Sequence, residues 1–129
     1  MPKEFSRSQR LAEQLRRELA EIVRDEIKDP RLGFVSFTEA RMSRDLSHAI
    51  IYCSVFHAEG NSPEKQKESV EVLNHAVGFI RKAVAHRIRA RIVPTLKFVL
   101  DDSISRGEAM DELINQAIKS DKEHDANGH

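Results

Sequence analysis

Tryptophan is missing from this sequence of 129 residues, which also contains only one tyrosine and one cysteine. A single cysteine, Cys53, excludes an internal disulfide and is typical of proteins from a reducing compartment. Cys53 lies in an apolar stretch, where a cysteine more often packs in the core than acts as a nucleophile. We therefore expect a cytoplasmic protein that folds around a hydrophobic core without disulfides.

No apolar run approaches the roughly 18 residues that a membrane-spanning helix needs. The N-terminal sequence MPKEFSRSQR also lacks the apolar segment of a signal peptide. With 40% hydrophobic and 33% charged residues, the composition is that of a globular domain whose helices expose charged faces. We expect one domain over residues 1–119, followed by a disordered polar tail over residues 120–129.

Sequence motifs of enzymes and metal sites are missing as well. The sequence contains no HExxH, no pair of CxxC motifs, no phosphate-binding loop and no nucleophile elbow. Its six histidines lack the spacing of metal ligands. The adjacent Asp101 and Asp102 fit a strand end and a helix cap better than an acid–base pair. We expect a protein that is not an enzyme and has no catalytic residues, cofactor or bound metal.

Acidic residues are absent from the stretch between Val72 and Leu100, which carries six basic residues. The whole chain is nevertheless neutral, because residues 1–71 carry a net charge of −1 and residues 101–129 carry −5. A helix of mixed charge usually presents only a solvated face. A stretch of +6 in a neutral chain instead indicates a surface for an anionic partner.

The periodicity of apolar residues and the positions of proline and glycine predict the secondary structure. The expected elements are a helix over residues 7–28, strands over 33–38 and 49–56 joined by a polar turn over 41–45, a helical stretch over 63–91, a strand over 96–100, and a last helix capped by Asp102–Ser103. Helices packed on one face of a small three-stranded sheet make a compact α+β domain.

One glycine, Gly78, lies inside the helical stretch, where glycine costs about 1 kcal/mol relative to alanine. It is either tolerated within a single helix, or it belongs to a break between two helices, for which Ala76 and Gly78 provide little side-chain bulk. Periodicity alone does not choose between these interpretations.

A set of short segments spreads over most of the chain. The segments are Asp29-Pro30-Arg31-Leu32-Gly33, Met42-Ser43-Arg44-Asp45-Leu46 followed by Ala49, Ala76-Val77-Gly78-Phe79-Ile80-Arg81, Arg91-Ile92-Val93-Pro94 with Leu96 and Phe98, and Asp101-Asp102-Ser103 with Gly107. In this order and spacing, the sequence resembles the bacterial ribosome-binding factor A family. The set is specific, although no single segment is.

The resemblance implies a type II KH-like fold in the order α-β-β-α-kink-α-β-α, with a kink at Ala76, Val77 and Gly78 in place of the GxxG loop of other KH domains. It implies a cytosolic factor that binds the free 30S subunit late in its maturation, leaves before translation, and supports rRNA processing and growth in the cold. The implied contact is 16S rRNA around its 5′-terminal helix and the neighbouring decoding region. We further expect a monomer without membrane or small-molecule partners.

The stretch without acidic residues provides the candidate contacts to RNA. At about 100° per residue, Lys82, His86 and Arg89 lie opposite the apolar side of the helix, whereas Arg87 and Arg91 fall nearer to it. The expected RNA-binding residues are Arg81, Lys82, His86, Arg87, Arg89, Arg91 and Lys97. The secondary basic candidates are Arg7, Arg10, Arg41 and Arg44.

Aromatic residues are few, and most of the six phenylalanines fall in strand patterns or beside Gly78, where we expect core packing. Few rings are then left for stacking on single-stranded bases, so recognition of folded RNA through shape and phosphates is favoured. The main alternative is a generic KH-like protein that binds single-stranded RNA, although the GxxG loop of such proteins is missing. A protein-binding adaptor would be favoured if the basic face were dispensable.

Overall fold

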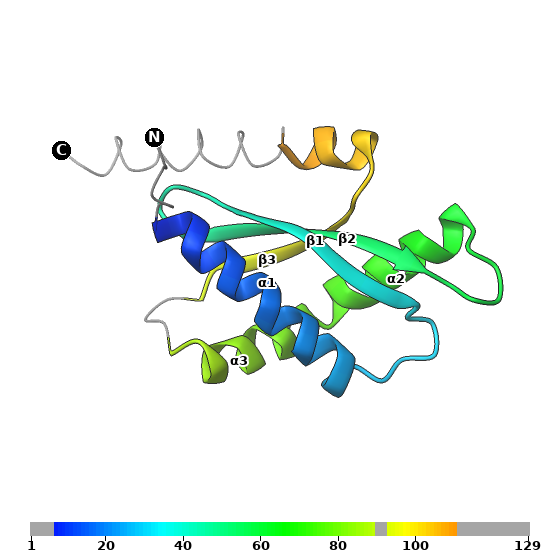
Figure 1. Cartoon of the computed structure of the whole chain (residues 1–129), viewed down its shortest axis with the longest axis horizontal. Helices are drawn as coiled ribbons and strands as arrows, with labels where there is room; N and C mark the ends of the chain where they lie inside the picture. The colour runs from blue at the N-terminus through cyan, green and yellow to red at the C-terminus, as the bar shows by residue number, and fades with distance from the viewer. Residues whose placement is uncertain (1–6, 90–92, 111–129) are drawn as a thin grey trace, which may run out of the picture.

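The computed structural model describes residues 7–89 and 93–110 (Figure 1). The elements are α1 (Arg7–Glu26), β1 (Phe34–Met42), β2 (His48–Phe56), α2 (Pro63–His75), α3 (Val77–Arg87) and β3 (Thr95–Leu100), followed by a helical segment over residues 103–110. The predicted order α-β-β-α-α-β-α is confirmed. The predicted tail, and the predicted last helix beyond residue 110, lie outside the described residues.

The strands form one sheet with β2 in the centre. β1 pairs antiparallel with β2, and β2 pairs parallel with β3. A parallel pair needs a crossover connection of a dozen or more residues, and the helices α2 and α3 provide it. Because this helix pair leads directly into β3, its contacts with β3 help to fix the position of α3.

β1 is longer than predicted, because Arg41 and Met42 pair with β2 and do not belong to the turn. The turn is confined to a few residues by the carboxylate of Asp45, which accepts hydrogen bonds from the hydroxyls of Ser43 and Ser47, each at 2.7 Å. These bonds stabilise the charged form and lower the pKa of Asp45 to about 2.

Helices α1, α2 and α3 cover one face of the sheet and enclose the main hydrophobic core (Figure 1). The longest of them, α1, buries one apolar stripe that includes Leu15, Leu19 and Ile22. The rings of Phe37 on β1 and Phe98 on β3 meet at a centroid distance of 5.8 Å beneath the helices. Within the described residues, no helix is long and apolar enough to cross a membrane.

The other face of the sheet is partly covered by the helical segment 103–110. Side chains alternate between the two faces of a strand, and Ile50, Tyr52 and Val99 on this second face pack with Ala109. The expectation that the helices lie on one face therefore holds for α1, α2 and α3 but is wrong for this segment. Burial on both faces also explains why β2 is apolar without a break from Ala49 to Cys53.

Arg106 attaches this segment to the sheet. Its guanidinium lies 3.9 Å from the centroid of the Tyr52 ring and pairs with the carboxylates of Asp101 and Glu39. Asp102 caps the segment by accepting a hydrogen bond of 2.7 Å from the backbone N–H of Ser105. The predicted structural use of both aspartates is confirmed.

Cys53 is completely buried in the main core. Burial disfavours the thiolate and raises the pKa of this thiol to about 12. The thiol therefore stays protonated at neutral pH, and the prediction that Cys53 is a packing residue is confirmed.

Candidate nucleic-acid interface

The helical stretch is broken where the sequence allowed a break. α2 ends at His75 and α3 begins at Val77, with Ala76 between them at φ −91° and ψ 8°. The backbone N–H of Ala76 still donates to carbonyl oxygens of α2, at 3.0 Å to Val72 and 3.1 Å to Leu73. The interpretation as two helices is confirmed.

Gly78 does not form this break through an unusual backbone conformation. It lies within the first turn of α3, and the only described glycine with a positive φ is Gly60. A Cβ atom placed on Gly78 would meet no atom within 4 Å. Because glycine has no side chain, the surface beside the break is open at this position. Neither backbone strain nor close packing requires a glycine here.

Two side chains attach the helix pair to β3. The amide of Asn74 exchanges two hydrogen bonds of 2.9 Å with the backbone of Phe98. The guanidinium of Arg81 donates to the carbonyl oxygens of Pro94 at 3.0 Å and Val93 at 2.9 Å. Arg81, predicted to contact RNA, is thus already hydrogen-bonded within the protein. Asn74 was not identified from the sequence, where a single amide on a helix is no signal of such a contact.

Arg87 is also engaged within the protein. Its guanidinium lies 3.3 Å from a carboxylate oxygen of Glu18 and 2.8 Å from one of Glu21, both on α1. The hydrogen bond to Glu18, helped by the charge of Glu21, raises the pKa of Arg87. This ion pair joins α3 to α1 and directs Arg87 toward α1, as its predicted place near the apolar side of the helix implies.

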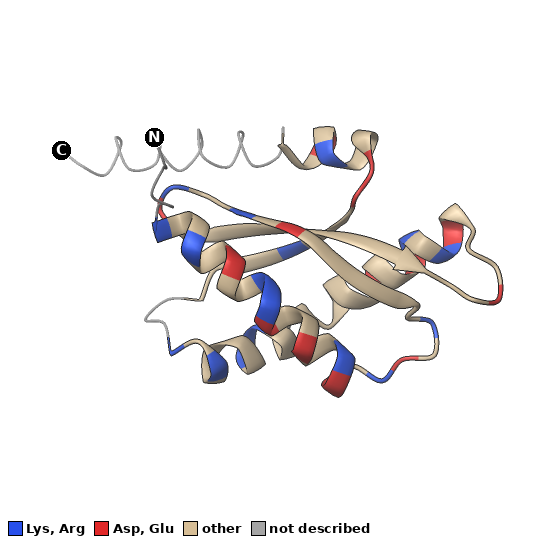
Figure 2. Cartoon of the chain, viewed as in Figure 1, with Lys and Arg blue, Asp and Glu red and all other residues tan. Residues whose placement is uncertain are grey.

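Lys82 and His86 are exposed on the outer side of α3, and the exposed Arg89 follows the helix with φ 39°. None of the three side chains has a hydrogen bond or an ion pair to another described residue. α3 carries no acidic residue, as Figure 2 shows by the absence of red from this helix. Lys82 and His86 on α3, together with Arg89 just beyond its end, are called the outer basic face, and their exposed side chains are available to an anionic partner.

One predicted contact that the structure describes, Lys97, does not join this face. Lys97 on β3 lies between Leu96 and Phe98, whose side chains enter the main core, so it projects from the opposite face of the sheet. Arg91 lies outside the described residues. The outer basic face of α3 is therefore smaller than the charge of the sequence stretch indicates.

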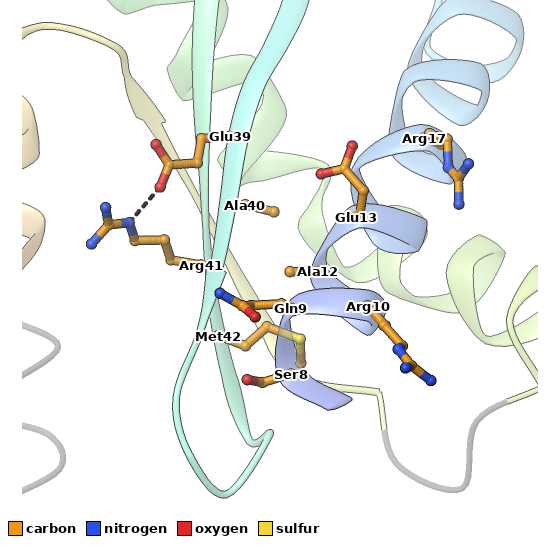
Figure 3. A pocket seen from close by; sticks show the side chains of 10 residues that line it. All are labelled: Ser8, Gln9, Arg10, Ala12, Glu13, Arg17, Glu39, Ala40, Arg41 and Met42. Carbon is orange, nitrogen blue, oxygen red and sulfur yellow. Dashed lines mark hydrogen bonds and ion pairs between the residues drawn. The ribbon is translucent and has the colours of Figure 1, made fainter. Parts of the chain in front are cut away.

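The secondary candidates gather around the start of α1 and the end of β1. Arg10 and Arg41 line a groove of about 720 Å³ between these two elements. Arg7 and Arg44, which are close to them in the sequence, are exposed. Figure 3 shows Arg10 directed away from β1 and Arg41 directed toward Glu39, with which it forms an ion pair. The groove itself is therefore not lined by converging cations.

The expectation that most phenylalanines pack in the core is wrong for three of them. Phe34, Phe56 and Phe79 are 76%, 59% and 52% exposed, respectively. The two strand residues lie opposite each other on β1 and β2, on the second face of the sheet. Phe79 precedes the buried Ile80 by one residue, and about 100° of helical rotation turns it out of the core.

This fold, with its break between two helices and its basic outer helix, is an α+β domain of the KH-like type. The family model for ribosome-binding factor A matches residues 7–114. A ribosome-binding factor A from Alkalilimnicola ehrlichii is 44% identical over 97% of this chain and 95% of the relative. The chain therefore belongs to the ribosome-binding factor A family.

Solved structures agree with this assignment. The solution structure of a Thermotoga maritima protein described as a putative ribosome-binding factor A has a TM-score of 0.68 at 31% identity, covering 80% of this chain and 94% of that one. A Thermus thermophilus ribosome-binding factor A, fitted as a homology model into the cryo-EM map of its complex with 30S, has a TM-score of 0.59 at 30% identity, covering 71% of this chain and 92% of that one.

Proposed function

We propose that this protein binds the free 30S ribosomal subunit through 16S rRNA and assists the late maturation of that subunit. The observation that carries the proposal is the outer basic face of α3, where Lys82, His86 and Arg89 are exposed and have no acidic partner among the described residues. Membership of the family, and the 30S complex of a related protein, support the choice of partner.

The internal contacts give this face a fixed position. Arg81 holds α3 against the backbone before β3, and Arg87 holds it against α1. The outer residues therefore project from a helix that is attached on two sides. Lysine and arginine side chains that neutralise phosphates release counterions, which supplies affinity without base specificity.

The proposed target within 16S rRNA is the 5′-terminal helix and the neighbouring decoding region, in a step that includes rRNA processing and matters most in the cold. We propose a cytoplasmic, non-catalytic monomer that leaves before translation. Lys97, which projects from the opposite face of the sheet, stays a predicted contact, and so does Arg91. Arg7, Arg10, Arg41 and Arg44 stay secondary candidates, although Arg41 is already paired with Glu39.

Sedimentation of cell extract tests this function. The protein should travel with free 30S subunits and be depleted from translating ribosomes. The alternative, a generic KH-like protein that binds single-stranded RNA, would distribute among RNA-containing fractions without preference for the free small subunit. Absence from the 30S fractions would contradict the proposal.

A further inference from the structure

An aromatic ring lies on the same side of α3 as the basic residues. Phe79 is 52% exposed, and the residue before it is Gly78, on which an added Cβ would meet no atom of a more distant residue within 4 Å. Phe79, Lys82 and His86 are spaced by three and four residues, which places them on successive turns of one helix face. The surface thus combines an open ring with two basic side chains.

We propose that Phe79 stacks on an unpaired RNA base while Lys82 and His86 contact the phosphates on either side of that nucleotide. This inference rests on the proposed function and deepens it, because it names what the α3 face takes: a looped-out or single-stranded nucleotide rather than a regular duplex. Bases in a regular duplex are stacked on one another, so only an unpaired base offers its surface to a side chain.

Charge favours RNA over a protein partner at this ring. No carboxylate lies on α3, and the two glutamates of α1 that contact this helix, Glu18 and Glu21, are bound by Arg87. An exposed phenylalanine beside basic side chains is the arrangement that single-strand RNA sites use, with stacking on the ring and salt-dependent contacts to the RNA backbone.

The other exposed rings have different surroundings. Phe34 and Phe56 line a cleft of about 640 Å³ whose charged residues include Glu59 and Glu68 as well as Arg31 and Lys65. Arg31 is paired with Asp29. Because charges of both signs are mixed there, Phe34 provides a matched control: an exposed phenylalanine of the same chain that should not meet RNA.

The absence of tryptophan from the chain makes a direct test possible. A Phe79→Trp variant contains one tryptophan, whose fluorescence is quenched when its ring stacks on a base. The full chain is titrated with a short RNA hairpin that has an unpaired loop, with a blunt duplex of the same nucleotides, and with free 30S subunits. Anisotropy of labelled RNA, and co-sedimentation for the subunits, report binding independently.

The proposal predicts quenching of Phe79→Trp by the hairpin and by 30S subunits, little change with the duplex, and no change for Phe34→Trp with any of the three. Binding of hairpin and subunits without quenching of Phe79→Trp would overturn the stacking and leave the proposed function intact. Failure of the wild-type chain to bind 30S subunits would overturn the proposed function itself.

Affinity provides a second measurement. Phe79→Ala should weaken hairpin binding by roughly 5- to 150-fold, the range that corresponds to the loss of one stacked base, whereas Phe79→Tyr should restore it. The salt dependence of binding should be the same for all three proteins, because no phosphate contact is lost. A Phe79→Ala variant that is folded and binds the hairpin like wild type would overturn the proposal.

Discussion

Arg81 and Lys82 are neighbours in the sequence, yet they belong to two different regions of α3. Arg81 and Arg87 form an inner pair whose guanidinium groups bind Val93, Pro94 and α1. Lys82, with His86 and Arg89, is exposed and has no partner among the described residues. A basic stretch of sequence can therefore contain side chains that stabilise the fold as well as side chains that are available to a binding partner.

The largest expected difference in stability concerns Arg81. In Arg81→Ala, the carbonyl oxygens of Val93 and Pro94 lose their charged donor, and partly buried acceptors left without partners cost about 1–3 kcal/mol. Chemical denaturation should show this loss in the free energy of unfolding. Arg81→Lys should recover only part of it, because a lysine cannot reproduce two guanidinium bonds. A variant as stable as wild type would contradict the assignment of Arg81 to the inner pair.

Gly78 should respond in the opposite direction. Gly78→Ala is expected to stabilise the protein by up to about 1 kcal/mol, because alanine is the better helix former and the added methyl group meets no neighbour. A thermal melt measures the gain. Destabilisation would show that the glycine is required for the break itself. Weaker RNA binding by the stabilised variant would instead show that RNA approaches the backbone at this position.

A smaller effect is expected for Arg87, although it makes two ion-pair contacts. Exposed ion pairs contribute little to stability, so Arg87→Ala should lower the free energy of unfolding only slightly and leave the salt dependence of RNA binding unchanged. A double-mutant cycle, which compares Arg87→Ala and Glu21→Ala with the double variant, measures the coupling free energy between the two side chains. A clear loss of RNA affinity in the single variant would move Arg87 to the outer basic face.

The smallest effect on stability belongs to the outer residues. Lys82→Ala should change the free energy of unfolding by no more than about 0.5 kcal/mol. It should nevertheless reduce the slope of log affinity against log salt by about one, since one phosphate contact is lost. A salt titration of binding beside a denaturation curve separates these two quantities.

Local sequence rules were sufficient for the order of elements and for several contacts. Hydrophobic periodicity found the helices and strands, proline marked their ends, and Asp102 was identified as a cap. The break at Ala76 was one of two interpretations that the sequence left open, because a small residue near a glycine fits either of them. These features depend on residues only a few positions apart.

The division of α3 into inner and outer cations depends on distant partners. Arg87 meets Glu18 and Glu21 of α1, and Arg81 meets the backbone that follows α3. Such pairings exist only after the domain has folded, so composition and periodicity do not show them. The exposure of Phe79 was missed for a related reason: an aromatic residue beside apolar ones indicates a core, until the neighbouring helices fix which side of α3 is covered.

The most direct test compares two double variants, one in the outer basic face and one, as a control, on α1. Lys82 and Arg89 are both changed to glutamate, and in the control Arg17 and Arg24 of α1, which carries charges of both signs, are changed in the same way. Binding to free 30S subunits is measured across a range of salt concentrations, beside a thermal melt of each variant. Two or three phosphate contacts at this face should contribute roughly −2 to −3 to the wild-type slope of log affinity against log salt.

The Lys82/Arg89 variant should keep the stability of the wild type but bind 30S subunits more weakly and with a flatter slope, whereas the Arg17/Arg24 variant should change less. If the folded Lys82/Arg89 variant bound 30S subunits with the wild-type affinity and slope, the outer side of α3 would be a solvated helix face, and the contact to RNA would lie elsewhere on the protein.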